Sequence, residues 1–144
     1  MYQYLLQAHS GIRYLVLLAL VVVIIKALMG LINKQPYSNV DNKLGLYLFI
    51  FTHTQLLLGL ILYFVSPFVQ FGSTTMSDKA TRYWTVEHVF AMLIAVVLIT
   101  LARSTSKRMT DDTLKHKRML IFNTIALVVI VATILMSGRK LFGS

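Results

Sequence analysis

Four long runs of apolar residues, separated by short polar stretches, dominate this 144-residue chain. The runs cover residues 14–32, 44–66, 83–102 and 119–138. Each is close to the roughly 20 residues that an α-helix needs to cross the hydrocarbon core of a bilayer. Inside lipid every backbone N–H and C=O must be bonded within its own segment, so the runs predict transmembrane helices even where β-branched residues cluster.

The four runs predict an all-α integral membrane protein. Because short links join antiparallel neighbours, its expected architecture is an antiparallel up-down-up-down four-helix transmembrane bundle, formed by residues 1–144 as a single domain. The predicted helices cover about residues 8–32, 44–66, 83–103 and 118–138. The first run has no small-residue cleavage site after its apolar core, so we expect it to be retained as a helix.

Composition agrees with a membrane protein. Hydrophobic residues make up 57% of the chain and charged residues only 13%, whereas a soluble domain has about 25% charged residues. The chain therefore has too little polar surface for water, and we expect the lipid bilayer to surround it.

The cations are divided unequally between the two sides of the predicted bundle. Nine of the 14 Lys and Arg residues lie in or beside the links 33–43 and 103–118, and five lie on the opposite side. The positive-inside rule predicts that these links are cytoplasmic and that both termini are extracytoplasmic, in a multi-pass protein of a bacterial inner (cytoplasmic) membrane. Because the net charge of +9 is shared between two faces, anionic lipid head groups explain it better than nucleic acid.

The candidate chemistry is limited to histidines. With no cysteine, disulfides, thiolate metal sites and covalent c-type haem are excluded. The chain has no Ser-His-Asp or H-E-x-x-H arrangement, so we do not expect an enzyme, but at most an electron-transfer component. The histidines that remain are His9, His53, His88 and His116.

Depth in the bundle distinguishes these histidines. His9 and His88 each lie about one turn from the outer end of the first and third helices, which are diagonal neighbours, so they can face each other across the core. A planar macrocycle held between two imidazoles requires this arrangement. His53 lies about 20 Å below the outer end of its helix, at 1.5 Å per residue, which is too deep for the same ligand plane. We expect His116 in a solvated basic loop. Hydrogen-bonded structural roles remain the alternative, above all for His53.

Ionisable residues accompany the two outer histidines. Charged groups at membrane depth tend to face a bundle interior, and Glu87 and Arg13 both lie near the outer boundary. We expect them to form an ion pair between the first and third helices, with proton transfer as the alternative. Arg13 or Arg82 can pair with a haem propionate, and Gly11 and Ala91 are expected to leave room for a flat ring.

Several stretches also carry a resemblance to known proteins. They are His9-Ser10-Gly11-Ile12-Arg13-Tyr14-Leu15-Val16-Leu17-Leu18, the helix around His53, Arg82-Tyr83-Trp84-Thr85-Val86-Glu87-His88 and Lys115-His116-Lys117-Arg118. Over nearly its whole length the chain resembles a small four-helix bacterial membrane protein family commonly labelled "cytochrome b". The resemblance implies a non-covalent b-type haem and electron transfer, with His9, His53 and His88 at the positions of the family's histidines. In the larger respiratory cytochromes b one helix carries two histidines, which this chain lacks, so a two-haem wire is not expected.

Three functions follow from these observations. The first is a small b-type cytochrome-like protein with His9 and His88 as the metal ligands and with quinone or a larger membrane complex as the redox partner. The second is a non-catalytic accessory or assembly subunit of a larger membrane complex. The third, a transporter or copper-handling protein with His and Met ligands, is the weakest because we do not expect a Met or His one turn from another along any helix.

Overall fold

The computed structural model describes residues 2–67, 69 and 71–137, and these residues form a helical protein. The helices are α1 (Tyr2–Ile32), α2 (Asn39–Val65), α3 (Lys79–Arg82), the π-helix η1 (Tyr83–Glu87), α4 (His88–Lys107) and α5 (Asp112–Met136). Because α3, η1 and α4 follow one another without a break, the described residues contain four helical segments long and apolar enough to cross a membrane. This confirms the predicted helical class and the four candidate spans.

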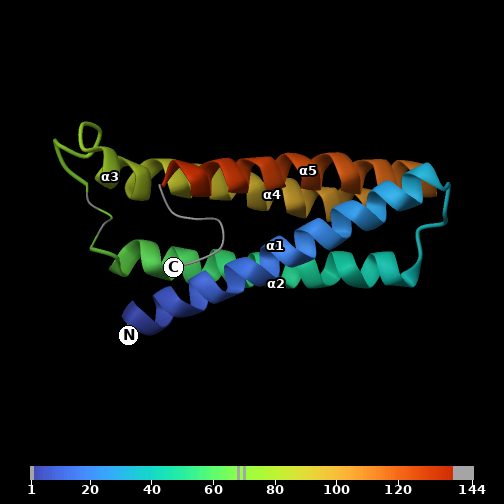
Figure 1. Cartoon of the computed structure of the whole chain (residues 1–144), viewed down its shortest axis with the longest axis horizontal. Helices are drawn as coiled ribbons and strands as arrows, with labels where there is room; N and C mark the ends of the chain where they lie inside the picture. The colour runs from blue at the N-terminus through green and yellow to red at the C-terminus, as the bar shows by residue number, and fades with distance from the viewer. Residues whose placement is uncertain (1, 68, 70, 138–144) are drawn as a thin grey trace.

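Successive long helices run in opposite directions (Figure 1). The α1–α2 and α4–α5 links lie at one end, which we call the inner end; the start of α1 and the α2–α3 connection lie at the other, the outer end. The main packing pairs are α4 with α5, α1 with α2, and α1 with α5, whereas α2 and α4 contact each other less. The helices that carry His9 and His88 are therefore diagonal, as predicted.

The helices extend beyond their apolar runs because capping residues begin them inside the polar links. Ser38 caps α2: Asp41 accepts a hydrogen bond from the Ser38 backbone N–H (2.8 Å), and the Ser38 hydroxyl accepts one from the Asp41 N–H. This reciprocal capping box supplies hydrogen-bond partners for the first turn. Asp111 accepts from the N–H of Thr113 and Leu114 in the same way at the start of α5. Both helices consequently begin at least five residues before the predicted boundary.

The end of α1 requires an unusual backbone conformation. The Gln35 N–H donates to the Gly30 carbonyl oxygen (2.9 Å), which is the six-residue bond of a Schellman motif. Lys34 occupies the left-handed position of this motif, with φ of 52°. Glycine is usual there because a Cβ is strained in this region. The link therefore stores a small amount of backbone strain at Lys34.

Buried apolar side chains from all four long helices form the core of the bundle. Those that are at most 1% exposed are Leu20, Leu48, Ala102 and Ala126. Many large apolar side chains point outward instead, among them Leu18 (63% exposed) and Phe90 (65%). An apolar exterior of this kind matches a lipid environment rather than water.

Candidate functional site

A pocket of about 190 Å³ lies in the outer half of the bundle. Residues of α1, α2, η1, α4 and α5 line it, and most of these residues are apolar. Leu60 of α2 and Leu93 of α4 belong to the lining although they are 41% and 39% exposed on the outside of the bundle. The pocket therefore reaches the apolar exterior between α2 and α4, where the helices contact each other less.

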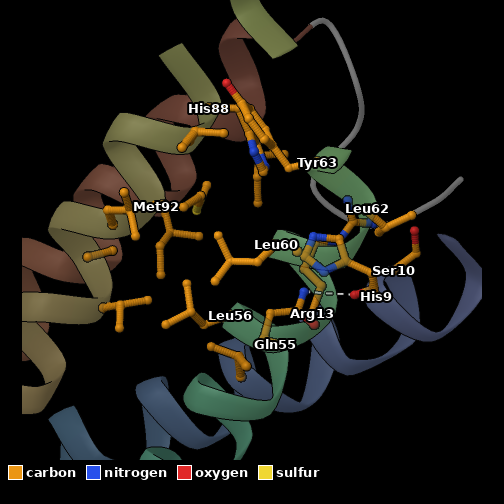
Figure 2. A pocket seen from close by; sticks show the side chains of 18 of the residues that line it. His9, Ser10, Arg13, Gln55, Leu56, Leu60, Leu62, Tyr63, His88 and Met92 are labelled. Carbon is orange, nitrogen blue, oxygen red and sulfur yellow. Dashed lines mark hydrogen bonds between the residues drawn. The ribbon is translucent and has the colours of Figure 1, made fainter. Parts of the chain in front are cut away.

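His9 and His88 enter this pocket from α1 and from the start of α4 (Figure 2). Their ring centroids are 6.5 Å apart, and the ring planes make an angle of 65°. The structure thus brings together the two histidines that the sequence places on diagonal helices at similar depth. Whether they bind a metal remains a prediction from the sequence.

The π-helix η1 precedes His88 directly and sets its direction. A π-turn contains more residues per turn than an α-helix, so it rotates every residue after it around the helix axis, and such turns occur frequently at functional sites. Two tyrosines anchor this region: the Tyr63 hydroxyl donates to the Thr85 carbonyl oxygen (2.8 Å), and the Tyr83 hydroxyl donates to the Thr133 carbonyl oxygen (2.7 Å). This π-helical segment was not predicted, because hydropathy carries no signal for it.

A glycine on α2 allows that helix to approach His9. A Cβ added at Gly59 would lie 3.2 Å from Cε1 of His9, whereas a Cβ at Gly11 would meet nothing within 4 Å. Gly11 and Ala91, which were expected to leave room for a ring, do not line the pocket; Gly59 and Ala95 line it instead.

Two polar groups of α2 also line the pocket. The Gln55 amide nitrogen donates to the His9 carbonyl oxygen (2.7 Å), which fixes the orientation of the amide. The Gln55 Oε1 atom and the Thr52 hydroxyl are buried and have no hydrogen-bond partner among the described residues. Leaving such a group unsatisfied costs about 1–3 kcal/mol, so both are available to a bound molecule or to water.

The charged residues are arranged differently from the prediction. Glu87 accepts a hydrogen bond from Nε of Arg82 (2.6 Å), and the two form an ion pair. The expected Arg13–Glu87 pair is therefore wrong: Arg82 lies five residues before Glu87, and the π-turn between them brings the two side chains together. Arg13 lines the pocket and donates to the Tyr14 hydroxyl (3.1 Å).

The other two histidines have structural partners. His53 lies 2.9 Å through Nδ1 from the Phe49 carbonyl oxygen and 3.4 Å through Nε2 from the Thr100 hydroxyl, which supports the structural interpretation. The expectation of a solvated His116 is wrong, because this side chain is fully buried. The physical reason is that α5 begins at Asp112, so His116 lies inside the helix and faces α1 instead of belonging to a loop.

Met92 lines the pocket. It lies four residues after His88, so both side chains occupy one face of α4, as Figure 2 shows. The expectation that no Met or His lies one turn from another along a helix is therefore wrong. Among the described residues no group of three or more His, Cys, Asp or Glu side chains could hold a metal ion. The described residues therefore do not support a metal ion held by three or more of these side chains. A haem, in contrast, needs only two ligands from the protein.

Comparison with known proteins identifies no family, since no family model, curated protein or solved structure matches the chain. The site is therefore interpreted from its own geometry.

Proposed function

We propose that the pocket binds a b-type haem non-covalently between His9 and His88, and that the protein transfers electrons within the membrane. The observation that carries this proposal is the 6.5 Å separation of the two imidazole centroids. A metal–imidazole nitrogen bond is about 2.0 Å long, so two imidazoles on opposite sides of one ion have ring centres roughly 6 Å apart. The two rings therefore already lie near the spacing that axial ligation requires.

The residues that line the pocket suit haem chemically, but the pocket is too small to enclose the whole ring. An apolar lining suits the macrocycle, and Arg13 suits a propionate because guanidinium and carboxylate form charge-assisted pairs. Arg82 is engaged by Glu87 instead. The volume of about 190 Å³ is smaller than the roughly 300–1,000 Å³ of ligand pockets. A bound ring would thus be only partly enclosed, and the opening beside Leu60 and Leu93 would accommodate the remainder.

A haem held by His9 and His88 would supply one-electron exchange rather than binding of a small gas molecule. Leu20 and Leu48 are buried about one turn below the lining residues Leu17 and Thr52, and they lie between the pocket and the inner end. The redox partner must then approach through the outer half of the bundle, as a lipid-soluble quinone or as a subunit of a larger membrane complex.

We also propose the orientation given by the cation bias, with the inner end in the cytoplasm of a bacterial cell. Lys107 at the inner end and Ser73 at the outer end are both exposed, and the chain contains no cysteine that would interfere. An impermeant thiol reagent added to intact cells should label Ser73→Cys and spare Lys107→Cys. Labelling of Lys107→Cys but not of Ser73→Cys would show the opposite orientation.

Haem titration of the detergent-purified protein tests the function. The wild type should acquire the absorbance spectrum of low-spin haem, and His9→Ala or His88→Ala should lose it, because one imidazole cannot supply both axial positions. His53→Ala is the matched histidine control, and Met92→Leu tests the neighbouring sulfur; both should retain the spectrum. A wild type that shows no Soret band after addition of haem would exclude this function and favour the accessory-subunit alternative.

A further inference from the structure

His116 is fully buried near the inner end of α5 and does not line the outer pocket. A Cβ at Gly30 would come within 2.4, 2.5 and 2.6 Å of three atoms of the imidazole ring. These nearly equal distances mean that the face of the ring lies against the backbone of α1. The Tyr37 ring centroid is 5.2 Å from that of His116 on another side. Three parts of the chain, namely α1, the α1–α2 link and α5, therefore surround the imidazole.

One nitrogen of this ring has a partner, and the other has none among the described residues. The Nε2 atom of His116 lies 3.1 Å from the Gln35 carbonyl oxygen. Because a carbonyl oxygen only accepts hydrogen bonds, Nε2 must carry the hydrogen. In the neutral ring Nδ1 is then an acceptor, and it is buried without a donor. A buried acceptor of this kind is unfavourable unless something donates to it.

A second, much smaller cavity of about 10 Å³ adjoins the ring. Besides His116, its polar lining residues are Lys26, Tyr37 and Asp41. The Lys26 ammonium lies 3.0 Å from Oδ1 of Asp41; it carries three N–H groups and can donate to a further acceptor. Burial, together with the negative charge of Asp41, raises the pKa of Tyr37, so its hydroxyl remains protonated.

We propose that this cavity binds one water molecule, which donates a hydrogen bond to Nδ1 of His116 and accepts one from Lys26. Its second O–H is directed to Asp41 or Tyr37, which gives the roughly three hydrogen bonds typical of a buried water. The volume excludes a polyatomic anion, and the ammonium of Lys26 opposes a metal cation. The water thereby connects α5 to the ion pair that joins α1 and α2.

Nuclear magnetic resonance of the full-length protein in lipid nanodiscs, with 15N-labelled histidine, tests this proposal. For His116 we expect a hydrogen on Nε2, an unprotonated Nδ1 with the chemical shift of a hydrogen-bonded nitrogen, and a cross-peak from Nδ1 to water. His53 is an internal control with the opposite tautomer, because its Nδ1 faces the Phe49 carbonyl oxygen. A hydrogen on Nδ1 of His116, or an Nδ1 with neither a hydrogen bond nor a water cross-peak, would overturn the proposal.

A double variant tests whether Lys26 holds the proposed water molecule. Lys26→Met combined with Asp41→Asn removes the ion pair without leaving a buried charge, and it should shift the His116 Nδ1 signal towards that of a free acceptor while the tautomer is kept. Lys34→Met is the matched control, since this lysine belongs to the same end of α1 but does not line the cavity, and it should leave the signal in place. An Nδ1 signal unchanged in the double variant would contradict the assignment of Lys26.

Discussion

The outer and inner halves of the bundle surround their histidines differently: His9 and His88 are half-buried, whereas His116 is fully buried. In each half a histidine contacts a glycine of a neighbouring helix, His9 against Gly59 and His116 against Gly30. The outer pair borders a pocket of about 190 Å³, whereas the inner pair borders a cavity of about 10 Å³. A histidine beside free volume and a second imidazole is equipped to bind a ligand; one enclosed by protein holds helices together.

The largest effect on stability is expected from Gly30→Ala. The new Cβ would come within 2.6 Å of three atoms of a fully buried ring, so the imidazole or α1 must move. Such overpacking costs about 1–3 kcal/mol. Thermal unfolding in detergent measures this loss.

The matching change in the outer half is Gly59→Ala. Its Cβ would lie 3.2 Å from Cε1 and 3.9 Å from Nδ1 of His9, and the neighbouring pocket gives the ring space to turn. We expect a loss of less than about 1 kcal/mol. If Gly59→Ala destabilised the protein as much as Gly30→Ala, the outer half would be as tightly packed as the inner half.

Thr52→Val tests the unsatisfied groups of the outer pocket. The Thr52 hydroxyl is buried without a partner among the described residues, so its removal should leave stability unchanged or raise it by roughly 1 kcal/mol. Thr133→Val is the control, because the Thr133 hydroxyl donates to the Val129 carbonyl oxygen (2.7 Å). Thermal unfolding of both variants should place Thr52→Val above Thr133→Val; the reverse order would show that Thr52 has a partner.

The smallest effect is expected at the inner link. Lys34→Gly relieves the left-handed backbone strain at φ of 52°, but it also increases the freedom of the unfolded chain. The net gain should be about 0.5 kcal/mol. Lys43→Gly, in the first turns of α2, should instead lower the unfolding temperature. Equal losses in the two variants would argue against strain at Lys34.

Hydropathy was sufficient for the four helices and for the diagonal placement of His9 and His88, because lipid imposes helical structure on any apolar run of this length. It underestimated the helix lengths, since it marks only the apolar part of each helix. The Ser38–Asp41 capping box was present in the sequence and would have placed the start of α2 correctly.

Other features depend on contacts between distant residues. The burial of His116 requires Gly30, which lies 86 positions away in the chain. The partner of Glu87 depends on the π-turn that directs it towards Arg82. Local sequence patterns contain neither piece of information, so a solvated histidine and a cross-bundle ion pair were the natural but incorrect expectations.

The most direct test of the proposed haem site is the response of the protein, after addition of haem, to carbon monoxide, measured by absorbance together with the number of haems bound per chain. If His9 and His88 hold the iron as proposed, we predict one low-spin haem per chain in the oxidised and reduced states and no spectral change with carbon monoxide. Ready binding of carbon monoxide, a high-spin spectrum or the absence of bound haem would contradict bis-histidine ligation in the outer pocket.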